Sequence, residues 1–383
     1  MIEVRELKKD KTELLEFINF PWIIYEKNPH WVPPIKTDLL KSFLEKNSKE
    51  KINCGPHAFF MAWEDGTPLG RILVGINEKK NLRINKNVGF FGYLEMINSP
   101  AVLSALMGQA FDWLKRHNID SLIGPLCPDD DVEGRGILIE GFDSPPVLMN
   151  PYNPPYYQTL LEGYGFSKDM EFYAYYTDKI SSLREKVDKV SDFAQQKFKF
   201  TIDKADLKFR EREIRDIAEI VNQIILSDNE EENGFEYAVP PTYESLYLEM
   251  NKLLPFLDQD LLYIARAGEK PIGFVFAIPD YNQVLKKLNG KLFPFGLFKF
   301  LWYKRKISGI RGFAQFVVPE YQNKAVVAAI FKQLLEVAER KNYKYIEGSQ
   351  IEERNLASRR IFENAGIAPY KTYRVYRKNN KKD

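Results

Sequence analysis

Apolar and polar residues follow a repeating order along the chain, and this order predicts elements that occur twice. Apolar runs on either side of a Gly-containing tip predict a β-hairpin in each half. An amphipathic helix ending at a turn before a new strand also occurs twice, as does a helix closing on glycine. The matching segments are 60–70 with 263–273, 113–124 with 337–348, and 160–166 with 361–367.

The three matches fall in the same order, at offsets of 203, 224 and 201 residues, which favours an internal duplication over chance similarity. Each half then reads as strand, helix, hairpin, strand, helix, strand, helix and last strand. This alternation predicts an α/β fold with a mixed sheet flanked by helices. We expect domains at 1–180 and 195–383, a linker or helix at 181–194, and a strand at 198–202 that opens the second half.

Composition narrows the class of protein. A length of 383 residues suits two domains, and 55 Lys and Arg against 53 Asp and Glu give no electrostatic case for nucleic-acid binding. Two cysteines and no export signal or spanning segment predict a cytoplasmic protein. Three histidines without a Cys/His cluster predict no metal site, and the carboxylates of 129–133 are more typical of a solvated loop than of a cation site.

Two motifs in the second half carry the chemical signal. Residues 313–330 read as a strand, a short loop and a helix, and a second helix motif follows at 351–367. The fixed spacing of the second motif is kept by Asn355, Ser358, Phe362, Gly366 and Ile367. Together the motifs resemble those of the GNAT (acyl-CoA N-acyltransferase) superfamily, so we expect two tandem GNAT-like domains.

The resemblance implies acetyl-CoA or a longer acyl-CoA as co-substrate. The strand would hydrogen-bond the pantetheine arm, and N–H groups at the start of the helix would hold the pyrophosphate. The implied binding residues are Phe316, Val317, Val318, Gln322, Asn323, Lys324, Ala325, Val326, Val327 and Asn355. This chain departs from the superfamily in having Ala325 and Val327 at the two loop glycines. It also has Phe362 where many members have a tyrosine that protonates the departing thiolate.

Other stretches resemble a bacterial family of tandem GNAT-like proteins. They are 20–25, 28–34, 141–157, 282–296 and 302–306. The resemblance implies direct acyl transfer from a thioester to the amine of a small molecule. Two alternatives stay open: a degenerate, non-catalytic GNAT-fold binding protein, and an aminoacyl-tRNA-dependent transferase, which the charge balance does not encourage.

Acyl transfer to an amine needs a base, and a partly buried carboxylate with a raised pKa suits that role. Glu140 and Asp143 flank Gly141-Phe142, and Glu95 ends the predicted strand 90–95, so we take these three as candidates. The first half has no counterpart of the phosphate loop. Its strand runs through Ser99, a helix cap, and Pro100 at the first helical position.

A proline-rich stretch, 144–157, has two interpretations. Rigid backbone with amide and phenol groups would make one wall of a ligand site. The candidate contacts are Asn150, Tyr152, Asn153, Tyr156 and Tyr157. The stretch could equally be a rigid connection into a helix at 156–164, capped by Asn153 with Pro154 at its first position.

The segment 292–306 is aromatic first and basic last. Its sequence favours a helix packed between the two halves. The alternatives are a lid or tunnel for an acyl chain, and peripheral contact with a membrane surface.

Overall fold

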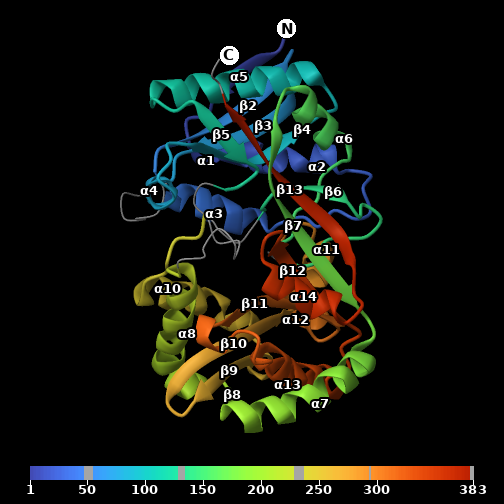
Figure 1. Cartoon of the computed structure of the whole chain (residues 1–383). Helices are drawn as coiled ribbons and strands as arrows, with labels where there is room; N and C mark the ends of the chain where they lie inside the picture. Colours follow the sequence, from blue (N-terminus) through green and yellow to red (C-terminus); the bar gives the residue numbers. More distant parts are fainter. Residues whose placement is uncertain (47–54, 128–133, 228–236, 293–294, 380–383) are drawn as a thin grey trace. The chain divides into compact units, whose positions relative to one another are not determined.

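The computed structural model describes residues 1–46, 55–127, 134–227, 237–292 and 295–379 (Figure 1). The chain forms two compact units, each built from separate stretches of sequence. Unit 1 contains Met1–Phe172, Tyr281–Arg305 and Lys371–Asp383, and unit 2 contains Tyr173–Asp280 and Lys306–Tyr370. No described helix has the length and apolar character that crossing a membrane requires.

These units are composed differently from the domains expected from the repeat. Two stretches of the second half, Tyr281–Arg305 and Lys371–Asp383, belong to unit 1. The expected linker 181–194 lies inside one long helix, α7 (Ile180–Phe198). The division at 180 and 195 therefore stays a prediction about the ancestry of the two halves.

Unit 1 contains a mixed sheet in which the strands are ordered β1-β2-β3-β4-β5-β13, with β6 also paired to β13. Its strands are β1 (Glu3–Glu6), β2 (His57–Glu64), β3 (Thr67–Gly75), β4 (Gly89–Met96), β5 (Ser121–Gly124), β6 (Ile137–Glu140), and parts of β7 (Ser167–Thr177) and β13 (Pro369–Asn379). Its helices are α1 (Lys11–Asn19), α2 (Pro21–Ile24), α3 (Lys36–Lys46), α4 (Glu78–Ile84), α5 (Pro100–Arg116), α6 (Tyr156–Gly163), α11 (Asn282–Leu288) and α12 (Gly296–Lys304).

The core of unit 1 lies on both faces of this sheet because alternate side chains of a strand point to opposite faces. Along β2, Phe60 belongs to the cluster that includes α5, whereas its neighbours Phe59 and Met61 belong to the cluster that includes α1 and α3. A strand buried on both faces reads as a nearly continuous apolar run, as 58–63 does.

Unit 2 repeats the same strand order, β12-β11-β10-β9-β8. Its strands are β8 (Thr201–Lys204), β9 (Leu262–Ala267), β10 (Lys270–Pro279), β11 (Gly309–Val317), β12 (Tyr345–Glu352) and the remaining parts of β7 and β13. Its helices are α7, α8 (Arg210–Ile225), α10 (Tyr243–Leu253), α13 (Val326–Arg340) and α14 (Leu356–Glu363). In both units three antiparallel pairings are followed by one parallel pairing, β4 with β5 and β11 with β12.

Local signals in the sequence specify several boundaries. Ser99 caps α5 through the N–H of Val102, and Pro100 is its first residue, as expected. Gly165 and Gly366 follow α6 and α14 in the left-handed conformation. The expected strand at 198–202 is wrong at its start, because Phe198 ends α7 and β8 begins only at Thr201.

Candidate active site

In unit 2, β11 and β12 pair over only part of their lengths. Their parallel register runs from Gly309↔Tyr345 to Gly312↔Gly348, although β11 continues to Val317. On its other edge β11 stays paired with β10 as far as Val317↔Gly273. The second half of β11 therefore presents, toward β12, an edge that an extended ligand arm could bind by main-chain hydrogen bonds.

Of the three strand residues expected to bind pantetheine, Val317 presents its backbone toward that edge. The N–H of Val318 donates to the carbonyl of Ile272, at 3.0 Å, so this group faces β10, and a contact of Val318 with the coenzyme stays a prediction. Because backbone groups alternate in direction along an antiparallel strand, the N–H and carbonyl of Val317 point away from β10, toward the open edge. Its carbonyl oxygen accepts a hydrogen bond from Nε2 of Gln322, at 3.4 Å, while Phe316 stacks on Phe274.

The loop after β11 keeps a glycine-type backbone although it lacks the glycines. Asn323 has φ 61° and Ala325 has φ 55°, both in the left-handed region. The first N–H groups of helix α13, which starts at Val326, have no intrahelical acceptors, as at any helix start. No side chain caps them, and the helix dipole adds positive potential there. This is the geometry that binds phosphates, with the half-buried side chain of Val327 standing where a glycine would leave space.

Replacing Ala325 by glycine should raise the free energy of unfolding by about 1 kcal/mol. The left-handed conformation costs an L-residue about 1–2 kcal/mol, and the larger backbone entropy of glycine in the unfolded chain offsets part of the gain. Ala328→Gly, in the first turn of α13, is the control and should be destabilising by up to about 1 kcal/mol. Urea denaturation measures both, and a destabilised Ala325→Gly protein would contradict the loop conformation.

Two residues of the second motif have structural roles. The Oδ1 atom of Asn355 accepts the N–H of Ser358 at 3.0 Å and caps α14, so its expected contact with the coenzyme stays a prediction. Phe362 stacks on Tyr175 with ring centroids 4.8 Å apart. A Cβ on Gly348 would lie 2.2 Å from Cζ of Phe362, so a tyrosine hydroxyl at this position would press against β12.

A carboxylate that sequence reasoning missed lies where β11 and β12 still pair. Glu347 on β12 is fully buried and stands opposite Arg311 of β11. Its Oε2 accepts from Oγ of Ser349 at 2.7 Å and its Oε1 from the hydroxyl of Tyr370 at 3.2 Å. Burial raises the pKa of Glu347 to about 7, against the opposing effects of Arg311 and the Ser349 hydrogen bond. The strand sequence, which also contains Ser349, Gln350 and Glu352, gave no signal that sets Glu347 apart.

In unit 1, Glu95 contacts Tyr157, one of the expected binding residues, and Tyr25, which was not among them. The hydroxyls of Tyr25 and Tyr157 each lie 2.8 Å from its Oε2, and Arg71 stands opposite it in β3. Burial raises the pKa of Glu95, whereas Arg71 and the two phenol hydrogen bonds act against this rise. The N–H of Met96, at the end of β4, donates to the Tyr157 hydroxyl at 2.8 Å. In the repeated strand order, β4 of unit 1 corresponds to β11 of unit 2. The end of β4 is thus already bonded by a side chain of unit 1, whereas the corresponding part of β11 has an open edge.

The proline-rich stretch provides walls of this cluster. Tyr156 donates to the carbonyl of Met96 at 2.7 Å, and the carbonyl of Tyr152 lies 2.9 Å from the Tyr25 hydroxyl. Asn150 is buried. The expected capping role of Asn153 is wrong, because its amide bonds both the N–H and the carbonyl of Leu138, and α6 begins at Tyr156.

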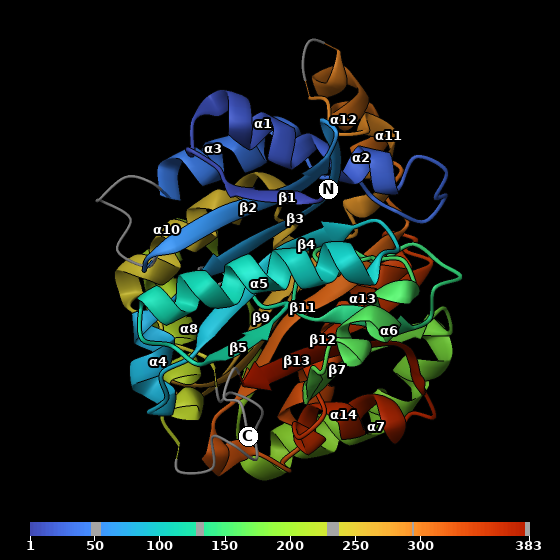
Figure 2. The ribbon, with the colours of Figure 1, turned by 90° about the horizontal axis from the view of Figure 1, so that it is seen from above.

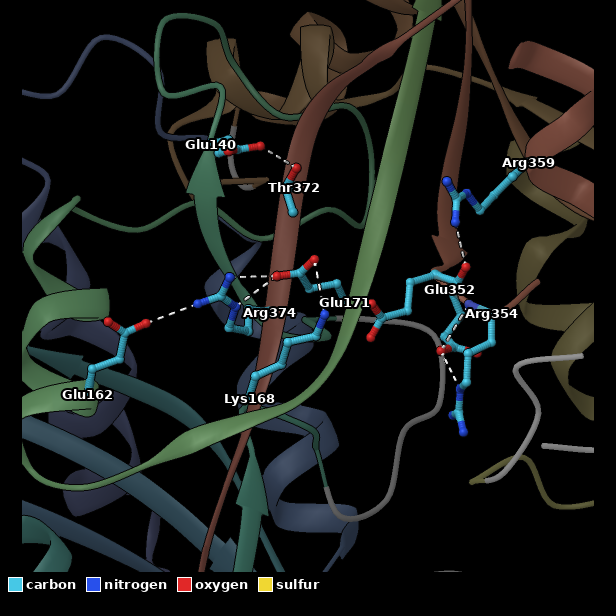
Figure 3. Close-up of polar contacts among 10 residues, drawn as sticks. Glu140, Glu162, Lys168, Glu171, Glu352, Arg354, Arg359, Thr372 and Arg374 are labelled. Atoms are coloured by element: carbon cyan, nitrogen blue, oxygen red, sulfur yellow. Dashed lines mark hydrogen bonds and ion pairs between the residues drawn. The ribbon is translucent and has the colours of Figure 1, made fainter. Parts of the chain in front are cut away.

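Glu140 and Asp143 do not have the burial expected of a base. Both are exposed, and Glu140 accepts a hydrogen bond from Oγ1 of Thr372 at 2.7 Å (Figure 3). The same view shows Arg374 between Glu171 and Glu162, an ion-pair network that anchors β13 within unit 1. Glu140 and the residues around Arg374 thus have structural roles in holding β13. The surroundings of Glu140 and Asp143 do not support a catalytic role for either carboxylate.

Within the residues that the structure describes, no group of three or more His, Cys, Asp or Glu side chains is arranged to hold an ion. The acidic stretch 129–133 lies outside the described residues.

Comparison with known proteins places the chain among relatives of the same length. No protein-family model matches it. It is 31% identical over 382 residues to Protein YghO of Escherichia coli (strain K12), covering 96% of this chain and 93% of that protein. It is 28% identical over 393 residues to the Bacterial ceramide synthase of Caulobacter vibrioides, covering 97% and 96%.

Among solved structures, a tandem GNAT protein from the clavulanic acid biosynthesis pathway matches over the whole of both chains. The TM-score is 0.57 and the sequence identity 10%. This likeness shows the fold, a tandem GNAT fold, and agrees with the repeated strand order of the two units.

Proposed function

Because this chain belongs to the same family as Protein YghO of Escherichia coli and has a tandem GNAT fold, we propose that it is an acyl-CoA-dependent N-acyltransferase. It would transfer an acyl group directly from the thioester to the amine of a small molecule. The observation that carries the proposal is the presence, in unit 2, of an open strand edge, an uncapped helix start and a buried carboxylate of raised pKa.

Unit 2 would bind the donor. The Val317 edge of β11 would hydrogen-bond the pantetheine arm, and the N–H groups of Val326 and its neighbours would bind the pyrophosphate. The left-handed Ala325 supports this assignment, because it gives the loop the backbone course that a glycine usually takes.

Glu347 would act as the base through Tyr370, the half-buried phenol that donates to it. The amine nitrogen attacks the thioester carbonyl, the C–N bond forms and the C–S bond breaks. The proton lost by nitrogen passes to the Tyr370 hydroxyl while the phenol proton moves to Glu347, and coenzyme A leaves as the thiolate. A carboxylate whose pKa is about 7 is half ionised at neutral pH and can accept that proton.

The relative named as a ceramide synthase supports a proposal on the chemical class of the substrates. A ceramide is a long-chain amino alcohol acylated on its nitrogen. We therefore take a long-chain acyl-CoA as the donor and a long-chain amino alcohol as the acceptor for this chain.

Calorimetric titration with palmitoyl-CoA below its micelle concentration, and with acetyl-CoA, tests the donor site. We expect the wild-type chain to bind, and Val327→Glu to weaken binding at least tenfold because a carboxylate would repel the pyrophosphate. A carboxylate in the first helical turn does not destabilise the helix, so the variant should stay folded. Val190→Glu, on the exposed surface of α7, is the matched control and should bind like wild type.

Turnover is tested with palmitoyl-CoA and sphinganine, by the release of free thiol and by the mass of the amide product. Failure of the wild-type chain to bind either coenzyme would refute the donor site.

A second candidate function is a non-catalytic acyl-CoA-binding module, favoured by the packed phenyl ring of Phe362 where the superfamily tyrosine would supply a proton. Binding without turnover across acetyl, palmitoyl and intermediate chain lengths, with several amines, would select this function. Turnover with any of them would exclude it.

A further inference from the structure

Helix α12 and the residue before it expose five large apolar side chains. The exposed fractions are 72% for Phe295, 43% for Leu297, 73% for Phe298, 55% for Leu301 and 62% for Trp302. These side chains are not covered by unit 1, and the expected packing of this segment between the two halves stays a prediction. A water-facing surface of this composition on a short helix is typical of an interaction site.

The helix is attached to unit 1 by its other side. Phe300 stacks on Tyr281 with ring centroids 5.7 Å apart and almost parallel planes. Lys304 lies with its Nζ 5.7 Å from the centre of the same ring. These contacts hold α12 in a defined orientation, so its exposed face is a feature of the folded unit.

The segment that carries α12 is fastened to the N-terminal part of unit 1, and Figure 2 shows α11 and α12 beside α2. Nε1 of Trp22 donates to Oδ1 of Asn289 at 3.0 Å, and the N–H of Lys36 donates to the carbonyl of Gly290 at 3.2 Å.

The charge of this segment is one-sided. Residues 281–305 contain six Lys and Arg and no Asp or Glu, in a chain whose overall charge is only +2. Lys299 and Arg305 are exposed on or next to α12. Aromatic and leucine side chains with basic residues at their margin match the boundary of an anionic bilayer, where rings enter the headgroup region and cations contact phosphates.

We propose that the exposed face of α12, defined by Phe295, Leu297, Phe298, Leu301 and Trp302 with Lys299 and Arg305, docks unit 1 on the surface of an anionic lipid bilayer. The helix has nine residues, so it lies on the bilayer and does not cross it. The absence of acidic residues from 281–305 favours lipid over a second copy of this chain, since two such segments would repel each other. The proposal does not depend on the acyltransferase reaction.

Vesicle co-sedimentation tests the proposal with the full chain. The vesicles are phosphatidylcholine alone and phosphatidylcholine with about a third of phosphatidylglycerol. Phe298→Ser/Leu301→Ser should lower the partition coefficient at least tenfold for each side chain removed from the interface. Lys299→Ala/Arg305→Ala should lower it about fivefold for each cation, on the anionic vesicles alone. Leu248→Ser, an equally exposed leucine on α10, is the matched control and should bind like wild type.

All substituted positions are exposed, so thermal melting should confirm that the variants fold. Wild-type protein that fails to bind anionic vesicles would overturn the proposal, as would binding that is unchanged in Phe298→Ser/Leu301→Ser. Light scattering tests whether a second copy of this chain binds the face in place of lipid. A dimer that the same double variant dissociates, in a chain without vesicle binding, would assign the face to a second copy and also overturn it.

Discussion

Replacing Glu347 by glutamine should lower kcat/KM for acyl transfer by about 10²–10⁴-fold, the usual contribution of a positioned base. The amide keeps the shape of the side chain, and its oxygen can accept one of the two hydrogen bonds that Ser349 and Tyr370 donate, but it cannot take a proton. In the wild-type chain, kcat/KM should rise with pH through an inflection near 7, which the variant should lack.

Glu352→Gln is the control for this prediction. Glu352 is a second buried carboxylate of β12 whose pKa burial also raises, and it pairs with Arg354 at 2.8 Å. An equal loss in both variants would mean that neither carboxylate is specifically the base. A Tyr370→Phe protein as active as wild type would contradict the proton path through its hydroxyl.

Stability gives a readout of Glu347 that is independent of activity. Its folded pKa, about 7, lies above the ordinary value of 4.5, so the folded chain holds the proton more tightly than the unfolded chain does. The resulting stabilisation is fully present below pH 4.5 and is lost as the pH rises through 7, by up to about 3 kcal/mol. The Glu347→Gln variant has no carboxyl at this position, so its stability lacks this dependence on pH. Urea denaturation of both proteins between pH 4.5 and 8 should therefore show the wild type losing stability relative to the variant.

Replacing Glu95 by alanine should be destabilising by about 3 kcal/mol. Arg71 is 4% exposed, and removal of its carboxylate neighbour would leave a buried cation without that compensation, while two phenols would lose an acceptor. Breaking a buried pair costs about 3–5 kcal/mol, and Glu95 belongs at the low end because it keeps partial exposure.

Glu140→Ala is the matched control, since Glu140 is exposed and should change stability by less than about 1 kcal/mol. Guanidinium denaturation measures both variants. A Glu95→Ala protein of wild-type stability that has lost acyl transfer would restore Glu95 as the candidate base, in place of the structural role inferred from its partners.

Local signals in the sequence were sufficient for much of the fold. The hairpin tips at Gly66 and Gly268, the Ser99-Pro100 helix start and the closing glycines Gly165 and Gly366 all encode backbone conformations that neighbouring residues decide. The duplication followed because such signals recur in order. This is why the tandem fold could be predicted while its chemistry could not.

The errors concern residues whose partners are distant in the chain. Asn153 has the sequence of a cap, yet its amide is taken by Leu138 of a neighbouring strand. Glu347 has no motif around it, and its role depends on Arg311 and on Tyr370 from two other strands. The exposure of α12 could not be predicted because periodicity cannot distinguish a buried apolar face from one that faces water.

The composition of unit 1 has a consequence for how the protein is made. Residues 372–379 of β13 pair with β5 and β6, and Tyr376 is fully buried in the unit 1 core. During synthesis on the ribosome, unit 1 begins to emerge before unit 2. Its sheet cannot be completed until β13, which follows all other strands of both units, has left the exit tunnel. The synthesis of unit 1 thus begins before that of unit 2 and is completed after it, and a chain cut short before β13 lacks the strand that pairs with β5 and β6.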